Sequence, residues 1–239
     1  MRALYVIIGI LFSITAFGQS QSHEFTIDYT VKYLIDNAKE GTKDTITIGY
    51  EKNGKYLWTN FKRLTEELAS DIMPGLRNIP DGASNFVYAS EDNKIYMSVF
   101  LGPINMMMDM DMALVLQGTF SEDDKMNEEI VLESKQTLDP YRFNDKEYPK
   151  YEVYAAAEPD KPIIFAVDES KKMNNSALLI NFMKLMISAT ESSGGIQGGL
   201  PEGIILSIID DNGVTLLEAI DVNIKPRKIS LNNSFKISE

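Results

Sequence analysis

Apolar and polar residues alternate with a period of two through much of this chain. Phe25, Ile27, Tyr29, Val31 and Tyr33 are each separated by one polar residue, and this alternation is typical of a strand with one buried face. Other short apolar or alternating segments follow along the chain, most of them separated by brief turns. They cover residues 46–50, 56–58, 85–89, 95–100, 114–119, 129–136, 151–157, 163–167, 203–210, 214–225 and 234–238.

Tight turns join many of these segments. Asn53-Gly54 lies between two of them, and Asn and Gly tolerate the positive φ angles that two-residue hairpin loops require. Residues 91–94 and 211–213 are similar polar turns. About eleven strands joined in this way predict a large antiparallel sheet or a barrel. No linker or repeat divides the chain, so we expect one mainly β (α+β) domain.

Two segments have the spacing of helices instead. Residues 61–72 place apolar side chains on one face after a potential cap at Asn60, and a second helix is predicted over residues 176–191 after Asn174 or Asn175. The second segment carries a wide apolar arc. Its members include Leu179, Phe182, Met183 and Met186.

The N-terminus has a different character. An early charge at Arg2 is followed by an almost unbroken apolar run over residues 3–17, and Ala16-Phe17-Gly18 provides the small residues at which signal peptidases cleave. A membrane anchor would need about 20 apolar residues. We therefore predict a signal peptide over residues 1–18, a single mature domain over residues 19–239, and export to the periplasm or to the outside of the cell.

Charge and composition narrow the function. Without Arg2 the mature chain has 22 basic and 35 acidic residues, a net charge of −13, which disfavours nucleic acid and anionic lipid surfaces as partners. Cysteine is absent and His23 is the single histidine. Thiolate catalysis, catalytic triads and His-based metal sites are therefore disfavoured. We expect no enzyme activity, no cofactor and no transmembrane segment in the mature chain.

The most unusual local sequence is a run of methionines from Met106 to Met112. In an extended conformation Met106, Met108, Met110 and Met112 would share one face, although the sequence leaves strand, helix and loop open. Soft thioether sulfur binds Cu(I). Methionine also fills irregular apolar space and lines adaptable binding surfaces. The run therefore indicates a ligand-cavity wall or lid, ordinary packing or, as a weaker alternative, a Cu(I) site.

The last third of the chain has a more specific order of motifs. Residues 199–203 open a hairpin with a Gly-x-Pro sequence, residues 204–218 form that hairpin around Asp211-Asn212-Gly213, and residues 231–237 read Leu-Asn-Asn-Ser-Phe-Lys-Ile. This order resembles the end of proteins of the LolA-like lipoprotein-carrier superfamily and of related exported families. The N-terminal strand and the Asn53-Gly54 hairpin are similar as well.

The resemblance implies a half-barrel, a single curved antiparallel sheet of about eleven strands with two helices covering its concave face. In that superfamily the concavity holds acyl chains or another apolar ligand. No arginine-gated cavity or carrier partner site can be placed in this chain, and a lipid-anchor cysteine is missing.

These observations lead to one main hypothesis and two alternatives. The main hypothesis is a non-catalytic envelope protein that binds a lipid or acyl chain in the concavity. One alternative is a structural or interaction protein with a self-filled core and an envelope protein partner; the weaker one is Cu(I) binding by the methionine run. The candidate ligand-binding residues are Leu179, Phe182, Met183, Met186, Met106, Met108 and Met110.

Overall fold

The structure is a computed structural model and describes residues 22–37, 42–60, 83–101, 104–111, 130–171, 173–178, 180, 196–232 and 234–235. Strands dominate these residues, and one short helical segment comprises residues 175–178 and 180. The prediction of a mainly β fold is confirmed.

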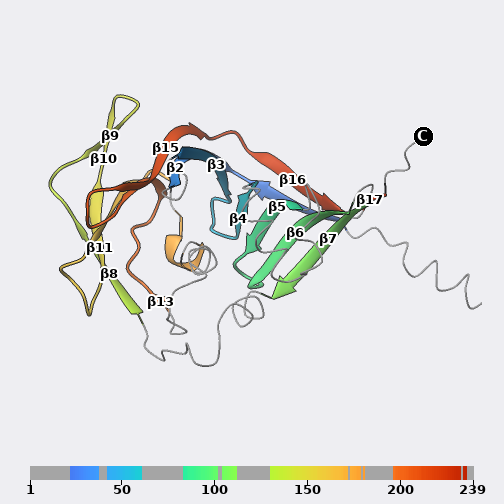
Figure 1. Cartoon of the computed structure of the whole chain (residues 1–239), viewed down its shortest axis with the longest axis horizontal. Coiled ribbons are helices and arrows are strands. Elements are labelled where there is room, and N and C mark those ends of the chain that lie inside the picture. Colours follow the sequence, from blue (N-terminus) through green and yellow to red (C-terminus); the bar gives the residue numbers. More distant parts are fainter. Residues whose placement is uncertain are drawn as a thin grey trace, which may run out of the picture.

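One large sheet organises the molecule (Figure 1). Eleven of its 13 strands form a continuous antiparallel series, and a short strand extends each end, β13 (Ile196–Gln197) parallel to β8 and β17 (Ser234–Phe235) antiparallel to β7. In sheet order the eleven are β8 (Ile130–Gln136), β11 (Lys150–Ala155), β12 (Ile163–Asp168), β14 (Ile204–Ile209), β15 (Thr215–Asn223), β2 (Tyr29–Asn37), β3 (Thr42–Tyr50), β4 (Tyr56–Thr59), β5 (Ala83–Ala89), β6 (Lys94–Leu101) and β7 (Ile104–Asp111).

The first predicted strand is divided in two by the structure. The chain bends at Asp28, so that β1 (Ser22–Ile27) leaves the large sheet and pairs with β16 (Arg227–Asn232). Their apolar residues Phe25, Ile27, Ile229 and Leu231 are buried in one cluster with Trp58 and other side chains of the sheet. We call this two-stranded layer the β1–β16 ribbon, and the sheet face that it covers the outer face. Period-two alternation continues across Asp28, which is why the sequence suggested a single strand.

The opposite, inner face of the sheet carries the main core. Tyr33, Leu57, Phe86 and Met97 are among its fully buried residues. Met173, Leu178 and Ile180, in and just before the helical segment, belong to the same cluster. In Figure 1 this segment lies on the concave side of the sheet, between the strands β8 and β11 and the strands β5 to β7.

The helical segment begins at the predicted place. The backbone N–H of Ala177 donates to Asn174 Oδ1 over 3.0 Å, so Asn174 is the N-cap. Asn175 points its amide the other way, and Nδ2 donates to the carbonyl oxygens of Pro201 and Gly203 over 2.6 Å each. These bonds attach the start of the segment to the loop that precedes β14.

The cover of two helices is not part of the described structure. Residues 61–72 and 181–191, and the predicted strand 114–119, lie outside the described residues. Within the described part of the chain, helical residues occur only at 175–178 and 180, rather than in two long helices. None of the described helical residues forms a span long and apolar enough to cross a membrane.

A small hairpin was missed at sequence level. β9 (Tyr141–Phe143) and β10 (Lys146–Tyr148) pair with each other outside the large sheet. Asn144 and Asp145 form their turn with φ angles of 48° and 59°, the left-handed values that a tight hairpin requires. Each strand is three residues long, too short for an alternating pattern to emerge from the sequence.

Candidate functional site: the methionine face

Residues 106–111 of the methionine run lie in strand β7, so this part of the run is extended; Met112 lies outside the described residues. Residues 104–111 pair with β6 over their whole length. The extended backbone places successive side chains on opposite faces. Met108 and Met110 accordingly pack against the inner core, whereas Met107 is buried with the β1–β16 ribbon on the outer face.

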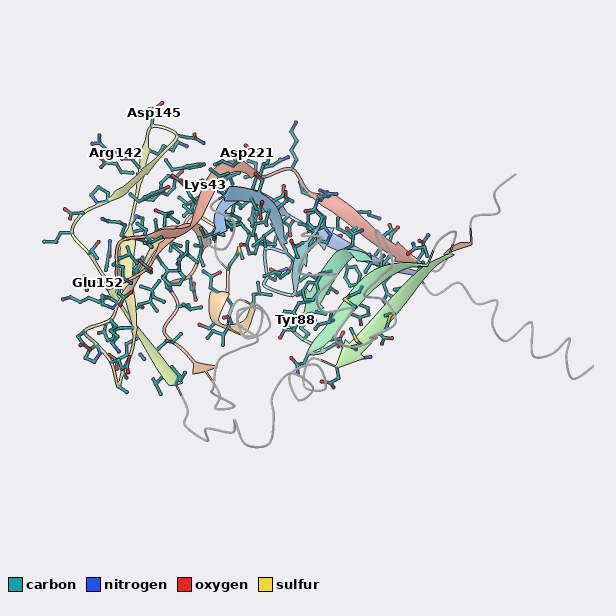
Figure 2. The ribbon with its side chains drawn as sticks, in the orientation of Figure 1. Lys43, Tyr88, Arg142, Asp145, Glu152 and Asp221 are labelled. Carbon is teal, nitrogen blue, oxygen red and sulfur yellow. The ribbon has the colours of Figure 1, made fainter. Side chains whose placement is uncertain are left out.

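The pairing of β6 with β7 adds a methionine that sequence analysis did not single out. Met97 of β6 lies directly opposite Met108, and Ile95 lies opposite Met110. Side chains that are directly opposite in an antiparallel pair have Cβ atoms about 4.5–5.5 Å apart. We call the inner-face group Met97, Met108 and Met110 the methionine face. Yellow sulfur atoms are visible along β6 and β7 in Figure 2.

Burial differs across the methionine face. Met97 has no exposed surface, and Phe86, opposite it on β5, has none either. Met108 and Met110 are only partly buried although they pack against the core. The face therefore has a dry base on β6 and an accessible rim on β7. Tyr88 belongs to the same inner-face cluster. In Figure 2 it lies well apart from Lys43 and Asp221.

The other predicted site residues are not brought together by the described structure. Met106 of β7 lies opposite Val99 of β6, but the Met106 side chain is not among those that the structure describes. Leu179, Phe182, Met183 and Met186 lie outside the described residues. The proximity of the helical arc to the methionine run therefore stays a prediction.

Farther along the inner face, two fully buried tyrosines form a polar bridge. Tyr33 Oη donates to the Ile205 carbonyl oxygen over 2.7 Å, and the two hydroxyl oxygens of Tyr33 and Tyr50 are 3.0 Å apart. Since the Tyr33 proton is used at Ile205, Tyr50 donates to Tyr33. Burial is the main cause that raises the pKa of both hydroxyls above the ordinary value of 10.0. Both groups are neutral donors at physiological pH, and they link β2, β3 and β14.

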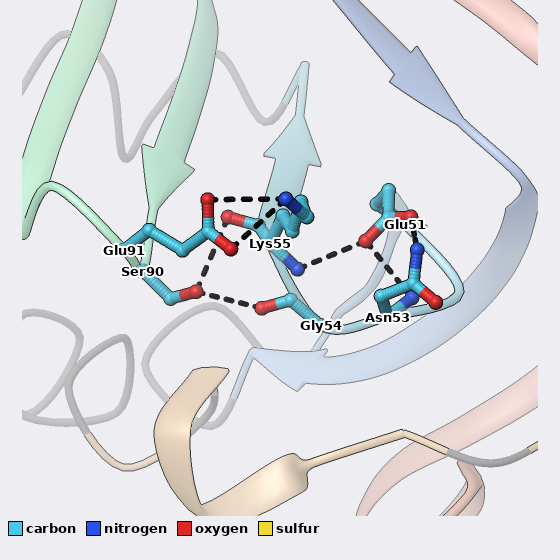
Figure 3. A network of polar contacts seen from close by, with 6 residues as sticks. All are labelled: Glu51, Asn53, Gly54, Lys55, Ser90 and Glu91. Atoms are coloured by element: carbon cyan, nitrogen blue, oxygen red, sulfur yellow. Dashed lines mark hydrogen bonds and ion pairs between the residues drawn. The ribbon is translucent and has the colours of Figure 1, made fainter.

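A second polar network holds the β3–β4 turn (Figure 3). The buried Glu51 carboxylate accepts hydrogen bonds from the backbone N–H groups of Asn53 and Lys55 and from Asn53 Nδ2, at 2.7–3.0 Å. Ser90 Oγ donates to the Gly54 carbonyl oxygen over 2.7 Å. Gly54, with φ at +78°, lies beside the start of the helical segment, where an added Cβ would be in ordinary van der Waals contact with Asn174 Cβ at 3.6 Å and Leu178 Cδ1 at 3.8 Å. The network therefore positions the turn against the helical segment.

Tyrosines beyond the centre of the sheet also have shifted pKa values. Burial, followed by a very short hydrogen bond to Glu169, raises the pKa of Tyr151 to about 12. Burial likewise raises the pKa of Tyr141 and Tyr148. A proton acceptor at neutral pH requires a lowered tyrosine pKa, so these shifts do not prepare any of the three hydroxyls for base catalysis.

The possible metal ligands at the methionine face are soft thioether sulfur atoms. Across the part of the chain that the structure describes, no group of three or more His, Cys, Asp or Glu side chains is placed to hold a metal ion. The thioethers of the methionine face are neutral, polarisable and adaptable in conformation. Such groups can contact an apolar ligand or coordinate a soft cation.

Two of the contacts described above could be found only from the structure. Met97 lies in a predicted strand, but its place beside Met108 depends on the pairing of β6 with β7. The Tyr33–Ile205 bond joins residues that are 172 positions apart. Alternation in residues 25–33 did indicate that Tyr33 is buried, but no local pattern identifies its partner.

Comparisons with known proteins give little further guidance. No protein-family model matches the chain, and a search of curated proteins finds no match. A solved structure described as "Structure of PNGF-II in P21 space group" aligns over 83% of this chain and 28% of its own length, with 12% identity and a TM-score of 0.37. At this TM-score the similarity carries no argument about fold or function.

Proposed function

We propose that this chain is an exported, non-catalytic envelope protein that binds an apolar ligand, a lipid or acyl chain, against the methionine face. The proposal treats the sheet as a LolA-like half-barrel whose concave side is the inner face. The observation that supports it most directly is the partial exposure of Met108 and Met110 beside a fully buried base that includes Met97 and Phe86. Apolar surface left accessible on a concave side is typical of ligand sites.

Flexible methionine side chains suit a ligand of variable shape. Thioether side chains adapt by rotation about three bonds and contact acyl chains without a fixed geometry. Each Å² of apolar surface removed from water contributes about 25 cal/mol before ordering costs. In this proposal Leu179, Phe182, Met183 and Met186 of the predicted helix would contribute the opposing wall, in the periplasm or outside the cell.

The test combines identification of a native ligand with a displacement assay. Native mass spectrometry of the mature protein from an exporting host, followed by organic extraction, should reveal a lipid adduct. A fluorescent fatty acid should bind and be displaced by unlabelled fatty acid. Replacing Met108 and Met110 together by Gln should weaken probe binding about tenfold or more, because polar amides replace apolar contacts.

Leu216 provides a matched control for this test. It is a 43% exposed apolar residue of β15, and Leu216→Gln should leave probe binding unchanged. Circular dichroism would establish that each variant is folded. A mature protein that carries no lipid and binds no fluorescent fatty acid would contradict the proposal.

One observation favours a second candidate, a structural or interaction protein of the envelope. The centre of the inner face is filled by the protein's own side chains, including Tyr33, Tyr50 and Leu178, each of which has 2% exposure or less. A ligand would therefore be confined to the side of the methionine face. If the apolar probe does not bind, capture of an envelope protein partner would support this alternative.

A further inference from the structure

The pairing of β6 with β7 arranges three thioethers as a set of soft ligands. Met97 and Met108 are directly opposite each other, and Met110 follows Met108 by two residues on the same side of β7. Diagonal neighbours across an antiparallel pair are about 7–8 Å apart at the backbone, within the reach of long side chains. From this arrangement we infer that the methionine face binds one monovalent soft cation, Cu(I), through the sulfur atoms of Met97, Met108 and Met110.

Ligand chemistry favours a monovalent soft ion over harder metals. Thioether sulfur is a neutral, polarisable donor that selects Cu(I), whereas Mg²⁺ and Ca²⁺ require oxygen ligands and Zn²⁺ prefers thiolate, imidazole or carboxylate. The nearest described carboxylate on β7, Asp109, lies on the opposite face and pairs with Lys94 over 3.1 Å. The three sulfur atoms therefore supply the ligand set on the inner face.

Burial supports a site with one accessible side. Met97 is fully buried, which keeps its sulfur away from bulk water, and Phe86 lies opposite it on the next strand. Met108 and Met110 are partly exposed and provide the route of entry. An ion held on this face would sit at the boundary between the dry core and solvent, where water competes less effectively with a neutral ligand.

Neutral ligands give this site a distinctive pH dependence. Metal binding through Cys, His or carboxylate ligands releases protons and weakens as the pH falls. Methionine has no proton to release, so Cu(I) affinity should change less than threefold between pH 5 and pH 8. His23, the one imidazole of the chain, lies beside Tyr96 with the two rings tilted and a ring-centroid distance of 4.9 Å, and Tyr96 belongs to the outer-face cluster.

The experiment measures Cu(I) retention by the mature protein under anaerobic reducing conditions, in competition with a chromogenic Cu(I) chelator. Native mass spectrometry gives the stoichiometry, with one ion per chain expected. Ag(I), which has similar ligand preferences and no accessible second oxidation state, serves as a second probe. Sulfur coordination should be visible by X-ray absorption at the copper edge.

Leucine substitutions separate thioether coordination from apolar contact. M108L and M110L conserve volume and apolar character, so they should be tolerated by the fold, and each should weaken Cu(I) binding at least tenfold. M97L tests the buried ligand. M107L, on the opposite face of the same strand, should retain wild-type affinity. Fluorescent fatty-acid binding is measured separately on the metal-free wild-type protein, so failure of this inference and failure of the proposed apolar-ligand function are distinguishable.

The inference is overturned by three results. The first is Cu(I) retention by the M97L/M108L/M110L variant equal to that of the wild type. The second is an affinity that falls steeply between pH 8 and pH 5, which would indicate ionisable ligands. The third is an absorption spectrum that shows only nitrogen or oxygen ligands.

Discussion

At the scale of single residues, the buried hydroxyl bridge of Tyr33 and Tyr50 makes stability sensitive to alkaline pH. Their pKa values are raised in the folded protein above the ordinary value of 10.0. The stabilising contribution of the two neutral hydroxyls is therefore complete below about pH 10 and decreases as the pH rises further, because the unfolded chain releases protons that the folded chain retains. We expect the urea midpoint to fall steeply above pH 10.

The double variant Tyr33→Phe/Tyr50→Phe is the control for that pH dependence. It keeps every lysine and exposed tyrosine, and its midpoint should decline less between pH 10 and pH 11.5 than that of the wild type. At pH 7, Tyr33→Phe alone should lower the free energy of unfolding by about 1–3 kcal/mol, because the Ile205 carbonyl and the Tyr50 hydroxyl both lose their partner. Equal alkaline slopes in both proteins would contradict this account.

At the scale of secondary-structure elements, the fit of the β1–β16 ribbon on the sheet depends on a glycine. A Cβ at Gly49 would lie 2.6 Å from Ile27 Cγ2 and 2.9 Å from Trp58 Cε3. Gly49→Ala should therefore displace the ribbon and cost about 1–3 kcal/mol of stability through overpacking. Fluorescence of Trp58, the sole tryptophan, should shift to longer wavelength.

Thr45→Ala is the matched control for Gly49→Ala. Thr45 is exposed on the same face of the same strand, so its substitution should change stability by about 0.5 kcal/mol or less. Unchanged Trp58 fluorescence in the Gly49→Ala variant would show that the ribbon can accommodate the methyl group.

Strands joined by short turns were predictable from sequence, and longer-range relations were not. Alternation located β2, and Asn53-Gly54 located the β3–β4 turn, because both signals are local. The bend at Asp28 was missed because the chain alternates on both sides of it while its buried face changes partners. Likewise, the methionine run could be identified as unusual, but the position of Met97 opposite Met108 depends on strand pairing.

At the scale of the whole molecule, the acidic net charge predicts which classes of partner are disfavoured. The mature chain predicted by cleavage after Gly18 has a net charge of −13. We expect it to bind neither duplex DNA nor anionic vesicles at about 50 mM salt, because there is no net attraction to a phosphate-rich surface. Co-sedimentation and electrophoretic mobility assays would check this, with neutral phosphatidylcholine vesicles as the comparison. Salt-sensitive binding to anionic vesicles would reveal a basic surface that the net charge conceals.

The pairing of an early strand, β2, with a late strand, β15, has a consequence for biosynthesis. β2 pairs with β15, joining Ile35 to Leu217 and Thr30 to Asn223. Strands β2 to β7 can form a meander as they emerge from the ribosome, but the group from β8 to β14 cannot join them until β15 has been made. A topology of such high contact order folds slowly. The edge of β2 consequently stays unpaired until the last part of the chain has been made, and we expect it to be a strand that a chaperone can hold in the meantime.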